Sequence, residues 1–331
     1  MVAEGGKTRN RFVELLIRLW QKNSVIVVFV FIIILCGIAA PRFLRPENLF
    51  TILRNTSMVG IIALGMTFII ISGGIDLSSG SVLATSGAVL IMLQHRVDAS
   101  GNPLFPLPFV ILICCLIAVG FGFVNGIIIS KASLPPFIVT LAIGIIARSV
   151  TNYFCSGKTV IGNRVPEFTR IGNGSLFNLI PLPFVIVIIL TIALNVILKR
   201  SKFGAYIFAI GGNENAARFS GIKVDRIKIF TYMLAGLCTG IAATIEMSRM
   251  AAVAVLTSGL MYEFDAITAV IIGGASLSGG KGRLIGTIVG FILLGMVTNI
   301  MIMLSLSPYL TGAVKGAVIL FAVLIQRREG Y

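Results

Sequence analysis

Long apolar runs recur along the whole chain, and they constrain its fold more than any other feature. Each run is about 17–22 residues long, which is enough for a helix to cross a hydrocarbon core of roughly 30 Å. Hydrophobic residues make up 57% of the 331 residues and charged residues only 12%, too few to cover a water-soluble domain. A membrane β-barrel would instead show short segments of alternating polarity. The sequence therefore predicts an all-α polytopic membrane protein.

About ten transmembrane helices fit the apolar runs best, with both the N- and C-termini in the cytoplasm. This topology places about twice as many Lys and Arg residues inside as outside, which is the bias that orients membrane proteins. A cytoplasmic segment at 1–23 then leads into a single transmembrane domain at 24–326, and residues 327–331 form a cytoplasmic tail. The predicted spans are 24–40, 57–72, 78–94, 107–130, 135–154, 181–199, 229–249, 263–276, 284–304 and 309–326.

Glycines four residues apart recur inside these runs, and small residues at that spacing let helix backbones approach closely. The pairs are Gly122/Gly126, Gly236/Gly240, Gly286/Gly290 and Gly312/Gly316. They predict a tightly packed bundle and say nothing about a ligand.

The loop at 199–228 concentrates cations between two apolar runs, so we expect it to stay in the cytoplasm. Asn213 suits a helix N-cap, Glu214 suits the positive end of a helix, and Gly221 suits a helix end. The segment is either a helix that docks on a partner protein or an ordinary surface helix. The residues assigned to it are Gly204, Gly211, Gly212, Asn213, Glu214, Ala216, Ala217, Arg218 and Gly221. Such loop cations also account for the net charge of +15 without any nucleic-acid partner.

The familiar enzymatic patterns are missing from the sequence. LSGGK at 277–281 resembles part of an ATPase signature, but a phosphate-binding loop also needs an earlier Gly and a Ser or Thr after the Lys. Ala275 and Gly282 occupy those two positions. His95 is the single histidine, and the five cysteines lack metal-ligand spacing. We therefore expect no catalytic residues, no metal and no cofactor bound by this chain.

Polar groups inside apolar runs are costly in lipid and usually face the interior of a bundle. Asp76 lies between two runs, where it either caps a helix that begins near Leu77 or belongs to a hinge or pathway. Arg148 and Lys315 also lie inside spans, and Lys315 is expected either to pair with a carboxylate or to snorkel. The candidates for a pathway or hinge are Asp76, Ser78, Asn125, Thr140, Gly273, Gly274 and Ser278.

A weak internal echo links two of these sites. GGIDLSSG at 73–80 resembles GGASLSGG at 273–280, and each segment follows one apolar run and leads into another. Transporters often contain repeats with glycine-interrupted helices beside the transport path. Convergent turn chemistry explains the echo equally well, so both interpretations remain open.

Several ordered motifs together resemble one known family, the permease subunits of ribose-type sugar ATP-binding-cassette importers, also called the branched-chain-type permease family. The matching segments are GGIDLSSGS at 73–81, VNG at 124–126, PPFIVTL at 135–141, the loop at 203–222, YEFDAI at 262–267 and GGASLSGGKG at 273–282. The resemblance covers about residues 45–325, and Ser79 is a small departure from the more apolar residue of many relatives.

The resemblance implies a sugar permease of about ten helices in a bacterial inner membrane, surrounded by lipid and paired with a second permease copy as a homo- or heterodimer. It implies a cytoplasmic ATPase subunit, which would use ATP and Mg, and a periplasmic or lipid-anchored sugar-binding protein. The loop at 204–221 would be the coupling helix that docks on the ATPase. An ion-coupled secondary transporter of a small polar solute is the alternative, with Asp76 as its best ion-binding candidate. The sequence does not identify the sugar.

Overall fold

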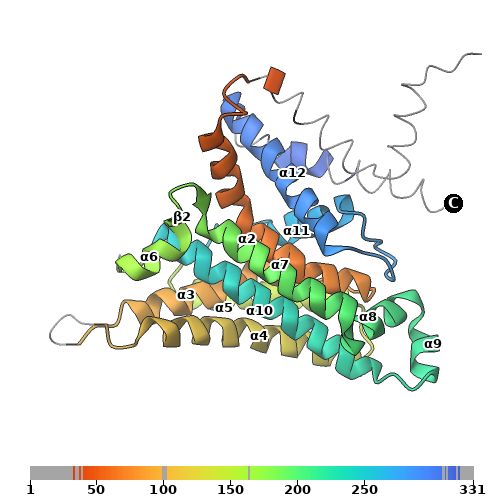
Figure 1. Ribbon diagram of the computed structural model, residues 1–331. Coiled ribbons are helices and arrows are strands. Elements are labelled where there is room, and N and C mark those ends of the chain that lie inside the picture. The colour runs from red at the N-terminus through yellow and green to blue at the C-terminus, as the bar shows by residue number, and fades with distance from the viewer. Residues whose placement is uncertain are drawn as a thin grey trace, which may run out of the picture.

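The computed structural model describes residues 40–98, 103–162, 165–307 and 312–317, together with Ile33, Gly37, Ile38, Leu310 and Leu320. Within these residues the chain is mostly helical (Figure 1). The helices are α2 (Pro46–Ile71), α3 (Ser79–Gln94), α4 (Leu107–Lys131), α5 (Pro136–Phe154), α6 (Pro166–Asn173), α7 (Leu182–Arg200), α8 (Lys202–Gly212), α9 (Glu214–Phe219), α10 (Val224–Met250), α11 (Tyr262–Ile272) and α12 (Leu284–Met303). The strands are β1 (Val160–Ile161), β2 (Ser175–Leu176), β3 (Ile180–Pro181) and β4 (Ala252–Val253), and β1 pairs antiparallel with β4 and β2 with β3.

Six of the described helices are long and apolar enough to cross a membrane, namely α2, α4, α5, α7, α10 and α12. Two other predicted spans are shorter helices. α3 has 16 residues and α11 has 11, which at 1.5 Å per residue gives roughly 24 Å and 17 Å, less than the hydrocarbon core. The predicted spans 24–40 and 309–326 fall largely outside the described residues, and the tails at 1–23 and 327–331 do so entirely.

Hydropathy placed the helix ends less well than the helices themselves. α2 begins at Pro46 rather than at residue 57, and α10 begins at Val224 rather than at 229, because polar first turns hide a helix start from an apolar count. Proline marks the start of α2 and α5, where its fixed φ suits a first turn and its missing N–H costs nothing. The predicted limits of α4, α5, α7 and α12 agree with the structure within a residue or two.

α10 lies at the centre of the bundle and contacts α2, α3, α4 and α6. Glycines let the backbones of α10 and α4 approach very closely. An added Cβ at Gly122 of α4 or Gly236 of α10 would lie within 2.4 Å of a backbone oxygen on the facing helix. Gly126 and Gly240 abut the facing backbone in the same way, and Gly290 lies against Ala269 of α11. The prediction that these pairs pack helices tightly is confirmed there, whereas an added Cβ at Gly312 or Gly316 would meet no described atom within 4 Å.

The structure has two distinct ends (Figure 1). α8 and α9 lie at one end, and α6 with the short strands lies at the other. The C-terminus of α3 is at the α6 end, where Gly162 adjoins Gln94. The C-terminus of α11 is at the α8 end, since the loop that follows it contacts Gly211 through Gly279.

Both short helices begin in the middle of the bundle, and this is the main departure from the predicted topology. An added Cβ at Gly144, near the middle of α5, would touch the Leu77 carbonyl just before α3. Tyr262, the first residue of α11, lines a cavity with Leu294 of α12, near the middle of that helix. Residues 72–78 and 251–261 therefore enter the bundle largely without helical structure, from opposite ends, and each becomes helical only halfway through.

Candidate functional site

The non-helical segment at 72–78 turns back from the end of α2 into the bundle. Gly73 has φ +81°, a conformation that suits glycine, and the Gly74 N–H donates to the Ile69 carbonyl at 2.9 Å to close α2. Beyond the turn, side chains from other helices satisfy the backbone. Thr140 Oγ1 accepts from the Leu77 N–H at 3.0 Å, and the buried Tyr232 hydroxyl donates to the Ile75 carbonyl at 3.2 Å. Irregular backbone at membrane depth requires such partners.

Asp76, Ser78 and Asn125 form a buried polar chain beside this backbone. Asp76 Oδ1 accepts from the Ser78 N–H at 2.8 Å and from the Ser78 hydroxyl at 2.6 Å. Asn125 Nδ2 donates to Ser78 Oγ at 2.9 Å, while its Oδ1 has no hydrogen-bond partner among the described residues. Asp76 is not the N-cap of α3, because that position belongs to Ser78. Four of the predicted pathway residues, Thr140 included, thus meet at one place.

The other three predicted pathway residues lie elsewhere, beside α8. Gly273 packs on the backbone of Gly286 at the start of α12. Ser278 lines a small cavity that Gly74, Glu214 and Tyr232 also border. Ser278 thus borders the same Tyr232 side chain that bonds to the Ile75 carbonyl of the first group.

The internal echo has a structural counterpart, shifted by one residue. Gly274 at φ +87° follows α11 as Gly73 follows α2, and the Ala275 N–H donates to the Val270 carbonyl as the Gly74 N–H donates to Ile69. The best match is therefore 73 with 274 rather than with 273. The similarity ends with this turn, because residues 276–281 close a tight loop whereas 75–78 run on into the bundle.

Arg148 of α5 joins the two broken spans. Its Nη1 donates to the Val255 and Ser258 carbonyls, each at 2.8 Å, and its Nη2 donates to the Gly80 carbonyl at 3.2 Å. Gly80 and Gly259 lie backbone to backbone, since an added Cβ on either would lie within 2.3 Å of the other's oxygen. The sequence showed Arg148 only as a cation within a span. Its carbonyl partners carry no sequence signal because they are main-chain atoms.

Lys315 pairs with a carboxylate and does not snorkel. Its Nζ lies 2.6 Å from Asp265 Oδ2 in α11. Asn299 of α12 likewise bonds a neighbouring helix, through two reciprocal 3.0 Å amide hydrogen bonds with Asn48 of α2.

The cationic loop contains two helices rather than one. Ser201 caps α8 by accepting from the Gly204 N–H at 3.1 Å, and Asn213 caps α9 by accepting from the Ala216 N–H at 2.9 Å. Gly211 and Gly212 are the last residues of α8 and directly precede the cap of α9. The predicted cap at Asn213 is confirmed, and so is the end at Gly221, which has φ +83°.

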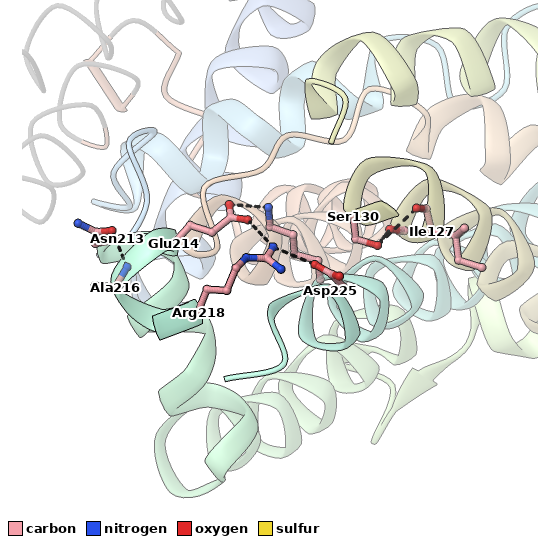
Figure 2. A network of polar contacts seen from close by, with 9 residues as sticks. Ile127, Ser130, Asn213, Glu214, Ala216, Arg218 and Asp225 are labelled. Atoms are coloured by element: carbon pink, nitrogen blue, oxygen red, sulfur yellow. Dashed lines mark hydrogen bonds and ion pairs between the residues drawn. The ribbon is translucent and has the colours of Figure 1, made fainter. Parts of the chain in front are cut away.

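Ion pairs tie α9 to the beginning of α10 (Figure 2). Glu214 Oε2 accepts from Lys228 Nζ at 2.6 Å, and Arg218 Nη2 lies 3.0 Å from Asp225 Oδ1 and 3.4 Å from Glu214 Oε1. The hydrogen bond and charge of Asp225, and then those of Glu214, raise the pKa of Arg218 above its ordinary value. These ion pairs between α9 and α10 hold the loop in place without any partner protein.

Glycines let α8 pack closely against both segments of the internal echo, 73–80 and 273–280. The Gly280 N–H donates to the Ile71 carbonyl at 2.9 Å, and an added Cβ at Gly279 would touch Gly211 and Gly73. Gly211 itself lies against the Ile71 carbonyl, with no room for a side chain. A movement of α8 would therefore act directly on the turn that leads into 75–78. We call this contact of Gly73, Gly211, Gly279 and Gly280 the glycine joint.

Comparison with known protein families identifies the family of this chain. A family model described as branched-chain amino acid transport system / permease component matches residues 48–323, most of the chain. The chain belongs to this permease family. The membership predicted from the motifs is thereby confirmed.

The permease is similar in sequence to named relatives over nearly its whole length. It is 40% identical over 300 residues to ribose import permease protein RbsC of Bacillus subtilis (strain 168), covering 90% of each chain. It is 34% identical over 316 residues to L-arabinose transport system permease protein AraH of Escherichia coli (strain K12), covering 94% of this chain and 92% of the relative. It is 32% identical over 317 residues to galactose/methyl galactoside import permease protein MglC of the same strain, covering 92% and 94%. No solved structure matches the permease.

Proposed function

We propose that the chain is the membrane-spanning permease subunit of an ATP-binding-cassette importer that carries a monosaccharide, of the ribose type or a related sugar, by alternating access. The observation that carries the proposal is the full-length similarity to relatives named for ribose, L-arabinose and galactose import. Partner subunits hydrolyse ATP with Mg, a sugar-binding protein delivers the solute, and a second permease copy completes the membrane domain. The ion-coupled alternative is not favoured by these relatives.

The topology proposed for it keeps about ten membrane crossings, with the termini and the α8–α9 end in the cytoplasm of a bacterial inner membrane. Cations at the α8–α9 end support this orientation. They lie at the end of α7, at the start of α8, in α9 and near the start of α10, namely Lys199, Arg200, Lys202, Arg218 and Lys228. In this scheme α3 and α11 are half-crossings, completed by the non-helical segments 72–78 and 251–261. Discontinuous helices of this kind recur in transporters.

Coupling is proposed to run from the ATPase through α8 and α9 to the glycine joint. The joint carries movement to the turn at Gly73 and then to the backbone at 75–78, which Tyr232 and Thr140 hold. The polar chain of Asp76, Ser78 and Asn125 would change its hydrogen bonds as that segment moves.

Uptake by the reconstituted importer tests the function. The permease, its ATPase and its binding protein would be placed in proteoliposomes and supplied with radiolabelled D-ribose, L-arabinose or D-galactose. We expect ATP-dependent accumulation of at least one of them, abolished when the phosphate-binding Lys of the ATPase is replaced by Ala. Accumulation driven by an ion gradient without ATP would instead establish the secondary-transporter alternative.

Reversing the charge of Glu214 should stop transport without unfolding the permease. Glu214→Arg places a third cation beside Lys228 and Arg218, so α9 should separate from the start of α10. The Glu214–Arg218 pair is exposed and such pairs contribute only about 0–1 kcal/mol, and the partly buried Glu214–Lys228 pair lies in the loop outside the bundle core, so the fold should survive. We expect uptake and solute-stimulated ATPase activity to fall to background, with an unchanged size-exclusion profile. Glu167→Arg on exposed α6 is the matched control, and normal transport by Glu214→Arg would refute the docking role.

A further inference from the structure

A cavity of about 150 Å³ lies between α2, α11, α12 and the helical residues 312–317. It occupies the half of the bundle away from α8, because its α2 lining comes from the N-terminal half of that helix and its α12 lining from the C-terminal half. Its lining is unusually polar for a membrane interior. The polar groups include Asn55, Tyr262, Asp265, Thr298, Asn299 and Lys315.

The Asp265–Lys315 pair gives this cavity both charges and no net charge. The side chains are 12% and 23% exposed, and the pair uses one oxygen of the carboxylate. Among the described residues, the other carboxylate oxygen of Asp265 and the remaining ammonium protons of Lys315 have no hydrogen-bond partner, so they are available to a solute. Ionisable groups in a membrane are costly, and they usually mark a site or pathway.

Neutral hydrogen-bonding groups extend the same surface. The Asn55 amide is exposed and has no hydrogen-bond partner among the described residues. The Thr298 hydroxyl donates to the Leu294 carbonyl at 3.0 Å, which leaves its oxygen free to accept. Tyr262 and Phe291 also line the cavity. Each hydroxyl of a sugar both donates and accepts, so it can use a lining of mixed donors and acceptors.

Size and charge narrow the class of solute. The cavity is smaller than the roughly 300–1,000 Å³ pockets that take drug-sized ligands, so it suits one small molecule. A carboxylate and an ammonium that neutralise each other favour a neutral solute over an ion. The residues predicted as a pathway from sequence, around Asp76, do not line this cavity.

We propose that this cavity is the site where the permease holds its solute in transit, a low-affinity site for one neutral polyhydroxylated ring of monosaccharide size. Asp265 accepts from its hydroxyls, Lys315 and Asn55 donate to them, and Thr298 accepts. The inference rests on the proposed function and adds the place where the permease itself contacts the sugar.

Near-isosteric substitutions test the site in the reconstituted importer. The probe is whichever of D-ribose, L-arabinose and D-galactose the unmodified importer carries. Thr298→Val and Asn55→Leu should each lower the number of sugar molecules moved per ATP by about three- to tenfold, the effect of losing one neutral hydrogen bond. Thr191→Val on α7 is the matched control, because Thr191 donates to the carbonyl four residues earlier just as Thr298 does and does not line the cavity. Uptake and basal ATPase activity of Thr191→Val should equal those of the unmodified importer.

Thiol protection gives a second readout that does not depend on turnover. Thr298→Cys, with the native cysteines replaced by Ala, should react with a small cationic methanethiosulfonate, and the transported sugar should slow that reaction while mannitol should not. Absence of labelling, or labelling without protection, would overturn the site. So would sugar-to-ATP ratios in Thr298→Val and Asn55→Leu equal to that of Thr191→Val. If the unmodified importer carries no sugar with ATP, it is the proposed function that fails.

Discussion

Replacing Arg148 with methionine is expected to leave little folded permease in the membrane. The guanidinium donates to the carbonyls of Gly80, Val255 and Ser258, and methionine fills similar space without a donor. The Gly80 carbonyl lies in α3 and keeps its helical hydrogen bond, whereas the Val255 and Ser258 carbonyls would each be left without a donor at about 1–3 kcal/mol, so the loss is about 2–6 kcal/mol. A typical folded domain is stable by only about 5–15 kcal/mol.

Size-exclusion chromatography of a fluorescent fusion in detergent measures this effect. We expect the monodisperse peak to disappear for Arg148→Met and to return in part for Arg148→Lys, since one ammonium lacks the planar fork that reaches several carbonyls. Arg96→Met, at an exposed position, serves as the control and should behave like the unmodified chain. A normal peak and normal melting for Arg148→Met would show that Arg148 does not hold the broken spans together.

Adding one methyl group at Gly211 is expected to abolish transport. An added Cβ would lie 1.7 Å from the Ile71 carbonyl oxygen and 2.5 Å from the Gly280 nitrogen, and neither backbone atom can give way cheaply. Gly211→Ala must therefore push α8 off the end of α2 and separate the glycine joint. We expect uptake to fall below detection while the bundle stays folded, because the clash lies at one end of the molecule.

The neighbouring glycine provides the control. Gly212 has nothing within 4 Å of an added Cβ, and Ala is preferred over Gly in a helix by up to about 1 kcal/mol. Gly212→Ala should therefore transport normally. Parallel assays of uptake and ATPase activity would separate the two variants, and equal uptake by both would exclude the joint as the coupling route.

The helical class and most spans follow from the sequence, because hydropathy reports lipid exposure directly. The turns at Gly73 and Gly221 were also predictable, since positive φ favours glycine and both residues follow helical patterns. Asn213 was recognisable as a cap from its position before Glu214 and two alanines.

The two half-crossings could not be predicted in the same way. Residues 73–77 and 250–262 were expected to lie between spans, but their return into the middle of the bundle depends on partners far away in sequence, as Thr140 and Tyr232 are for the first segment. Lys315 was visible as a charge in a span, but its pairing with Asp265 across 50 residues depends on the tertiary fold. The cavity beside them arises from that same packing.

The bridge made by Arg148 also has a consequence for how the chain is built. Its carbonyl partners at 255 and 258 follow it by 107 and 110 residues, while Gly80 precedes it by 68. At about 5–20 residues per second, the ribosome reaches Val255 roughly 5–20 s after Arg148 is made. During that interval the Arg148 guanidinium has the Gly80 carbonyl as a partner but not those of Val255 and Ser258. The growing chain therefore needs another group to shield this charge until residues 255–258 are in place.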